Sequence, residues 1–248
     1  MIYICVSTRN HAPTVGLVLW KVRQVFTEFP REYHLLVADE SGNDATSELL
    51  ERYQRVLPMT VLRSERPRSD AASLEALLRD ALGRTDRPKR DIAIVVPPNF
   101  AVSPDALPEL VRRIDSGADL VVAETFGHEH SFARRLIRRS AAWLLRPGVR
   151  VPGVRDLMSD CYALRLITLK LALRQQSGRL LESGNSACAR AELIARTASH
   201  ARQLATVPLP TRVVAEPRLE QHPLTLAVAL FRAGRALQID ASTARVQS

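Results

Sequence analysis

One carboxylate in the first part of the chain stands where it can take part in binding chemistry. Asp39 directly follows the apolar run at residues 34–38, so its side chain is expected at the end of a buried strand. A carboxylate in that position is a strong acceptor for a ligand N–H, because charge-assisted hydrogen bonds are stronger than neutral ones. The alternative is a turn residue that only bonds its own backbone.

Four arginines on one predicted helix form a second group with chemical potential. Residues 132–145 have helical periodicity, and Arg134 with Arg138, like Arg135 with Arg139, is spaced to share a helix face. Guanidinium groups bind phosphate in a bidentate manner, so the spacing predicts an anion site. A solvated helix face is the competing interpretation.

Histidine and cysteine residues do not predict a metal site. His128, Glu129 and His130 are adjacent, but Gly127 and Ser131 on either side indicate a loop. The three cysteines are far apart with no CxxC spacing, so neither a zinc site nor a disulfide framework follows. We expect them to be buried as small apolar residues.

The elements that position these residues alternate between strand and helix patterns. Such alternation predicts βαβ units and an α/β fold with a mostly parallel, Rossmann-like sheet flanked by helices. The strands are expected at residues 2–7, 34–38, 59–63, 91–96 and 119–123, and the helices at 13–29, 44–56, 69–82 and 104–114. Ligands of such sheets bind at the carboxyl ends of the strands. The loops 7–11, 39–44, 63–70 and 97–103 should therefore share one cleft.

The second half is less regular. It predicts a loop at 146–160, a strand followed by a helix at 161–173, helices at 132–145, 185–199 and 223–237, and a strand at 205–209. Residues 240–248 are expected to be frayed.

Several short motifs follow one another along the chain: Arg9–His11 (RNH), Asp39–Thr46 (DESGNDAT), Pro104–Pro108 (PDALP), Asp156–Cys161 (DLMSDC), Glu192-Leu193 and Val207-Pro208. In this order they resemble the motifs of family 2 glycosyltransferases of the dolichyl-phosphate-mannose-synthase-like branch. The resemblance covers residues 2–215 and implies a GT-A fold. It divides the chain into a nucleotide-sugar-binding half at 1–123, a less regular acceptor half at 124–215, and an amphipathic helix with a tail at 216–248.

The resemblance also implies roles for individual residues. The donor would be a UDP-, GDP- or dTDP-sugar, and the acceptor side would provide a general base if the acceptor is a hydroxyl. The resemblance assigns donor binding to Ser7, Arg9, Asp39, Asp70 and Asn99. It places Asp156 and Asp160 on the acceptor side and assigns phosphate binding to Arg134 and Arg138. For Asp160, an ion pair with a nearby arginine is the alternative.

The family's metal-binding Asp-x-Asp is replaced by Pro97-Pro98-Asn99. Two prolines offer no side-chain oxygen, and one neutral amide is a weak ligand for Mg²⁺ or Mn²⁺. We therefore assign no metal ligand, His222 included. The departure leaves three alternatives: metal-independent transfer, an arginine that replaces the metal, or no catalysis.

Two functions remain open. The first is an inverting transfer of a hexose to a polyprenyl phosphate or a small hydroxylated acceptor. The second is a catalytically inactive relative that binds a nucleotide or a protein partner. The run Pro97-Pro98-Asn99 favours the second, and the presence of Asp39 favours the first.

Composition narrows the class of partner. The chain has 248 residues, a net charge of +9 and only 5% aromatic residues, which leaves few platforms for stacking nucleic-acid bases. No signal peptide or membrane span is expected, so the predicted location is the cytoplasm. The stretch at 222–238 is amphipathic and carries Arg232 and Arg235. It is expected to pack on the domain or a twin subunit, or to lie on an anionic inner-membrane surface.

Overall fold

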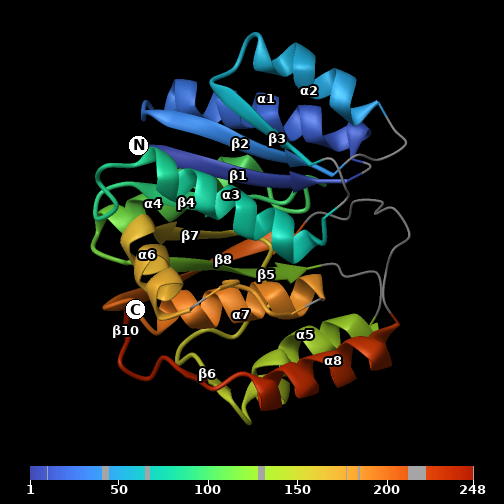
Figure 1. The fold of residues 1–248 in the computed structure, drawn as a ribbon, viewed down its shortest axis with the longest axis vertical. Helices are drawn as coiled ribbons and strands as arrows, with labels where there is room; N and C mark the ends of the chain where they lie inside the picture. The colour runs from blue at the N-terminus through green and yellow to red at the C-terminus, as the bar shows by residue number, and fades with distance from the viewer. Residues whose placement is uncertain are drawn as a thin grey trace.

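The computed structural model describes residues 1–9, 11–40, 45–64, 68–127, 132–176, 178–183, 185–211 and 222–247 (Figure 1). Within these ranges, no helix is both long enough and apolar enough to cross a bilayer.

An eight-stranded sheet forms the centre of the molecule, in the order β10-β8-β5-β7-β4-β1-β2-β3. Its strands are β1 (Ile2–Thr8), β2 (Tyr33–Asp39), β3 (Met59–Arg63), β4 (Ile92–Val95), β5 (Leu120–Gly127), β7 (Tyr162–Arg165), β8 (Gln203–Thr211) and β10 (Arg245–Gln247). Neighbouring strands are parallel except at β7, which is antiparallel to both β4 and β5. A second, two-stranded sheet joins β6 (Val149–Arg150) to β9 (Ile239–Asp240).

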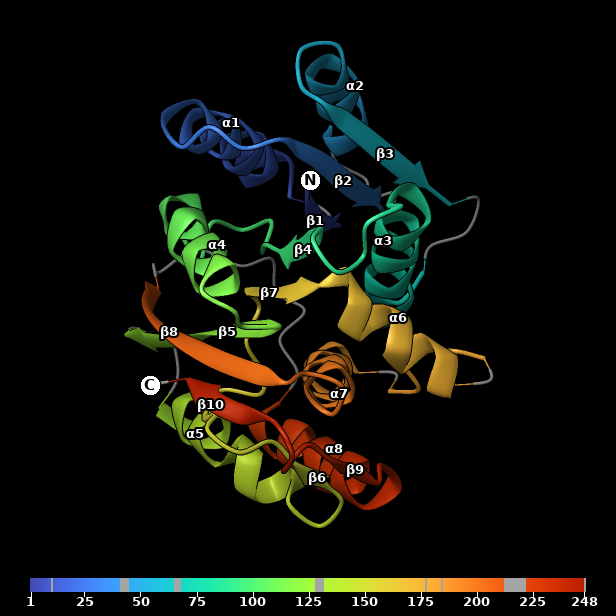
Figure 2. The same cartoon turned by 90° about the vertical axis from the view of Figure 1, so that its left-hand side faces the viewer.

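Helices cover both faces of the sheet (Figure 2). The first face carries α1 (Ala12–Glu28), α2 (Thr46–Gln54) and α4 (Leu107–Asp115), the last preceded by a 3₁₀ turn at Pro104–Ala106. The second face carries α3 (Asp70–Arg84), α6 (Leu166–Gln175) and α7 (Ser186–Ala198), and α5 (Phe132–Leu145) and α8 (Pro223–Ala236) extend that layer.

The side chains of β1 show why the sheet is buried on both faces. Ile4 and Val6 join the cluster under α1 and α4, whereas Tyr3 and Cys5 join the cluster under α3. This alternation is the two-residue period of a strand, and apolar residues on both faces require helices on both sides. The predicted α/β fold with a mostly parallel sheet is therefore confirmed.

The prediction of a frayed C-terminus was wrong. Residues 245–247 form β10, which pairs in parallel with β8. The Arg245 N–H donates to the carbonyl of Arg202 at 3.0 Å, and Ala241 and Ala244 are buried. These contacts fix a short segment that has no hydrophobic run of its own.

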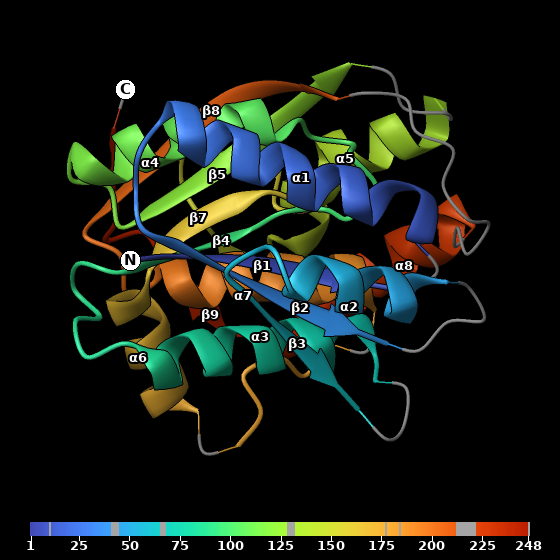
Figure 3. The same cartoon turned by 90° about the horizontal axis from the view of Figure 1, so that it is seen from above.

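The strand directions define one edge for ligands. In Figure 3 the arrowheads of β2, β3 and β5 point to the same side of the molecule. Because β7 runs the opposite way, the segment that enters it, rather than the one that leaves it, lies at this edge.

Candidate functional site

Asp39 ends β2 and lies beside Thr8, its register partner at the end of β1. Asp39 is 2% exposed and Thr8 is 1% exposed. The hydroxyl of Ser47 donates to Asp39 Oδ2 at 2.5 Å, which fixes the carboxylate. Asp39 Oδ1 and Thr8 Oγ1 are both buried and bond to no described residue. Unpaired buried polar atoms are costly, so these two atoms are suited to bind a ligand.

Glu40 and Arg9 connect the ends of β1 and β2 to the segment before α3. Glu40 accepts hydrogen bonds from the Ser73 hydroxyl at 2.5 Å and the Arg68 N–H at 2.6 Å. The Arg9 guanidinium donates to the Arg68 carbonyl, and its buried Nε bonds to no residue in the described part of the chain. Arg9 therefore keeps a donor at this edge.

The two other donor-side residues of the first half differ in exposure. Ser7 is half-buried on β1, opposite Ala38. Asp70 is exposed in the first turn of α3. The cap of that helix is Ser69, whose hydroxyl accepts from the Ala72 N–H at 3.2 Å.

Asn99 follows β4 but does not present a suitable set of metal ligands. It is 9% exposed, and its Oδ1 accepts the Ala101 N–H at 3.0 Å, so this oxygen closes the local turn. Pro97 and Pro98 provide no oxygen ligand from their side chains. These residue types do not fit a divalent cation. No cluster of three or more His, Cys, Asp or Glu that could hold one occurs among the described residues, and His128, Glu129 and His130 lie outside them.

Asp156 is held on several sides by its neighbours. Arg138 Nε lies 3.1 Å from Asp156 Oδ1 and 3.0 Å from Oδ2, and the Thr125 hydroxyl donates to Oδ2 at 2.8 Å. The Met158 N–H donates to Oδ1 at 3.2 Å. Because the carboxylate is 8% exposed, these bonds make Asp156 a fixed link between α5 and the loop before β7.

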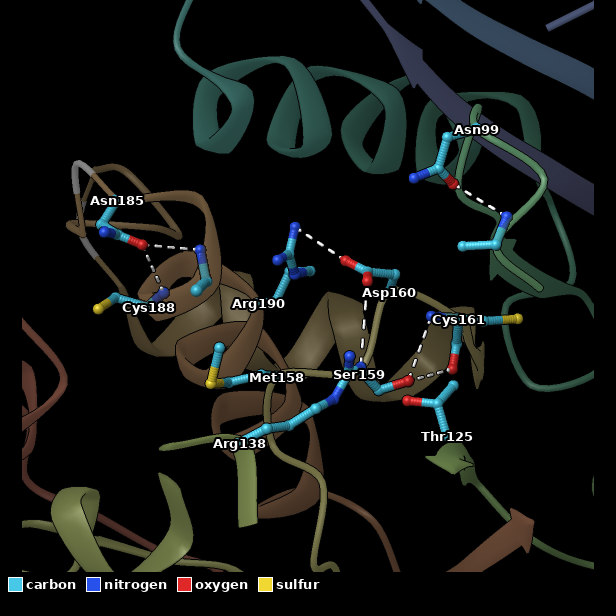
Figure 4. A network of polar contacts seen from close by, with 12 residues as sticks. Asn99, Thr125, Arg138, Met158, Ser159, Asp160, Cys161, Asn185, Cys188 and Arg190 are labelled. Carbon is cyan, nitrogen blue, oxygen red and sulfur yellow. Dashed lines mark hydrogen bonds and ion pairs between the residues drawn. The ribbon is translucent and has the colours of Figure 1, made fainter. Parts of the chain in front are cut away.

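Asp160 lies at the entrance to β7 and is more open, with 34% of its side chain exposed. Arg190 Nη1 of α7 lies 3.0 Å from Asp160 Oδ1, and Arg138 Nη2 of α5 lies 4.0 Å from Oδ2 (Figure 4). Ser159 fixes the loop through its hydroxyl, which donates to the carbonyl of Ala123 at 2.6 Å. Asp160 thus presents an accessible carboxylate between two cations.

Of the two arginines predicted to bind phosphate, Arg134 and Arg138, the structure describes the side chain of Arg138 alone. Arg138 turns inward to the two aspartates, whereas Arg135 and Arg139 are exposed. The side chain of Arg134 lies outside the part that the structure describes.

Thiol chemistry has no support in this site. Cys5, Cys161 and Cys188 are free and buried, as the sequence predicts. Burial raises the pKa of the Cys161 thiol to about 12 and that of Cys188 to about 11. Burial also raises the pKa of the Tyr162 hydroxyl above its usual range. These groups stay protonated near neutral pH, so none of them is a general base at that pH.

Two residues at this edge escape prediction from the sequence. Thr8 can be identified only from the parallel register of β1 and β2, which places it beside Asp39. Arg190 has none, because its contact with Asp160 joins elements thirty residues apart.

The sheet and its helix layers are those of the GT-A fold. The sequence profile of glycosyl transferase family 2 matches residues 3–165, from β1 to the end of β7. The chain belongs to this family. Comparison with curated protein sequences finds no significant match.

Three solved structures with the same fold are distant in sequence from this chain. S. aureus TarS matches at 16% identity and TM-score 0.59, over 86% of this chain and 36% of that one. Glucosyl-3-phosphoglycerate synthase from Mycobacterium tuberculosis, solved with Mn²⁺, UDP and phosphoglyceric acid, matches at 18% identity and TM-score 0.64, over 94% and 75%. The mannosyltransferase PcManGT from Pyrobaculum calidifontis, solved with GDP-Man and Mn²⁺, matches at 17% identity and TM-score 0.55, over 88% and 58%. The chain thus spans about a third of TarS and three fifths of PcManGT.

Proposed function

We propose that this chain transfers a hexose from a UDP-, GDP- or dTDP-sugar, as an enzyme of the dolichyl-phosphate-mannose-synthase-like branch. Residues 1–123 form its nucleotide-sugar half and residues 124–215 its acceptor half, with 216–248 as the C-terminal helix and tail. The observation that carries the proposal is the buried Asp39 Oδ1 beside Thr8, which bonds to no described residue, in a family 2 chain. Uracil, guanine and thymine all present a ring N–H that this oxygen can accept. Solved relatives that bind UDP or GDP-Man support this class of donor.

The acceptor side operates through Asp160. In an inverting transfer, an acceptor oxygen attacks the anomeric carbon and the bond to the diphosphate breaks. A hydroxyl acceptor loses its proton to the Asp160 carboxylate. A polyprenyl phosphate needs no base, and Arg190 and Arg138 then hold its charge. Asp156, which Arg138 and Thr125 already bind, positions this arrangement.

We propose that the transfer is independent of a divalent cation. Pro97, Pro98 and Asn99 do not fit a divalent cation. Arg9 lies at the ligand edge of the sheet and can stabilise the leaving diphosphate. Ser7 and Asp70 complete the donor side in this proposal, and Arg134 supplements Arg138.

Calorimetric titration with the three classes of nucleotide sugar, first with Mn²⁺ and then with EDTA, tests the donor site. Hydrogen bonds to charged groups contribute about 1.5–3 kcal/mol, so Asp39→Ala should weaken binding roughly ten- to hundredfold. Asp91→Asn is the matched control, since Asp91 is 7% exposed but precedes β4 at the opposite edge. Equal loss in both variants, or loss of wild-type binding with EDTA, contradicts the proposal.

A second function follows from the same residues 97–99. A catalytically inactive member would bind the donor without releasing nucleoside diphosphate in the presence of polyprenyl phosphate or hydroxylated acceptors. Donor binding that is lost in Asp39→Ala, with no turnover over a wide acceptor set, identifies this alternative.

A further inference from the structure

The helices α5 and α8 form a pair on one side of the molecule, remote from β3 (Figures 1 and 2). Their backbones approach closely where Gly234 of α8 meets α5. A Cβ at Gly234 would lie 2.8 Å from Leu145 Cα, so only glycine permits this contact. Buried Leu226 and Leu230 attach α8 to the core. The pair is therefore a firmly packed unit.

The outer side of this pair exposes large apolar side chains. We name it the α5/α8 face, and define it by Leu136, Trp143, Leu224, Val228 and Phe231, which are between 44% and 71% exposed. Between the helices, a groove is lined by Leu144, Val228, Phe231, Arg232 and Arg235, among others. Several large exposed apolar side chains on one pair of packed helices normally mark an interaction site.

The charged side chains that α5 and α8 themselves carry all have one sign. The exposed cations are Arg135, Arg139, Arg146, Arg232 and Arg235. Residues 132–150 and 222–239 contain no Asp or Glu. The α5/α8 face is therefore complementary to an anionic surface with an apolar interior.

We infer that the α5/α8 face docks on the surface of an anionic lipid bilayer. Both helices would lie in the interface, with Trp143 and Phe231 among the acyl chains and the arginines at the phosphates. A two-fold contact with a second copy would bring the same arginines together without any acidic partner, so charge disfavours it.

Docking would place the acceptor side of the candidate site close to the bilayer. Arg138 projects from the opposite side of α5 to Asp156 and Asp160. The acceptor side would then lie next to the headgroups, where a lipid-linked acceptor resides. This step rests on the proposed function, but docking itself does not.

Flotation of the full chain with lipid vesicles tests docking without any activity measurement. The probes are vesicles of phosphatidylcholine alone and vesicles that also contain phosphatidylglycerol. We expect binding only to the anionic vesicles, and weaker binding at high salt. Each arginine near such a surface contributes about 1 kcal/mol, so Arg232→Gln with Arg235→Gln should weaken binding about thirtyfold.

Apolar variants and matched controls separate docking from other causes. Trp143→Ser with Phe231→Ser should weaken binding by about tenfold or more, because less apolar surface leaves water. Leu17→Ser with Trp20→Ser, an exposed apolar pair on α1, should bind as wild type does. Arg55→Gln with Arg87→Gln controls in the same way for charge. Circular dichroism verifies that each variant is folded.

Three results would overturn the inference. The first is failure of the wild type to float with anionic vesicles, and the second is a loss of binding in the α1 variant as large as that in the α5/α8 variant. The third is a dimer in light scattering that Trp143→Ser with Phe231→Ser dissociates, which would assign the face to a second copy. Because no outcome uses a sugar donor, failure of docking and failure of the proposed transfer are distinguishable.

Discussion

Replacement of Arg138 by methionine tests whether this arginine is part of the framework or a free phosphate ligand. Its Nε lies 3.0 and 3.1 Å from the two Asp156 oxygens, and the side chains are 18% and 8% exposed. Removal of one partner from a buried ion pair costs about 3–5 kcal/mol. Because Arg138 retains some exposure, we expect the lower end, about 3 kcal/mol.

Thermal and urea unfolding measure this loss. For a domain of this size, 1 kcal/mol shifts Tm by about 2–4 °C, so Arg138→Met should lower Tm by about 6–12 °C. The next residue of the helix, Arg139, is exposed and serves as the matched control. Its substitution by methionine should change stability by no more than about 0.5 kcal/mol.

The double variant Arg138→Met with Asp156→Asn should be more stable than Arg138→Met alone. Asparagine removes the buried charge that the single variant leaves without its cation. Equal stability of Arg138→Met and Arg139→Met, or no recovery in the double variant, would refute the reasoning. If the double variant recovers its stability but does not bind ligand, the Arg138–Asp156 pair also contributes to ligand binding.

Two further predictions concern packing and pH. Gly148→Ala should destabilise the fold by about 1–3 kcal/mol, because its Cβ would lie 1.8 Å from the Leu237 carbonyl oxygen; Gly83→Ala, with open space around it, should stabilise α3 by about 0.5–1 kcal/mol in urea unfolding. Burial, and then the charge of Arg84, lower the pKa of His34 below 6.5, so the unfolded chain is protonated first as pH falls. The stability that His34 contributes is therefore complete above pH 6.5 and lost below it. The stability of His34→Gln should depend less on pH than that of the wild type between about pH 5 and 7 in urea unfolding. An unchanged pH dependence would show that His34 is not the titrating group.

Much of the fold follows from local patterns. Apolar runs of strand length, separated by helical periods, predict β1 to β5 to within a few residues. They also place Asp39 at the ligand edge, because the end of a hydrophobic run marks the end of a strand. Asp39 was therefore predictable as a candidate, although its unpaired oxygen was not.

Other features depend on contacts between distant segments. The pair of Arg190 with Asp160 needs α7 to lie beside the entrance to β7, and no local pattern encodes that approach. The helical spacing of the arginines is also compatible with a solvated face, yet Arg138 points inward and pairs with Asp156. The strand β10 is short and polar, and its pairing comes from the edge of β8. In each case a tertiary contact determines the position of a residue or strand that the hydrophobic periodicity of the sequence does not determine.

The central place of β7 has a consequence for synthesis of the chain. In the sheet, β5 and β4 do not touch, because β7 lies between them and pairs with both. A nascent chain that has reached residue 127 therefore has the open edge of β4, with backbone groups that lack a partner strand. Only when residues 162–165 leave the ribosome can the two parts of the sheet join. The match to the family profile ends at this same residue, 165, so the matched segment is also the shortest N-terminal piece in which β7 links β4 to β5.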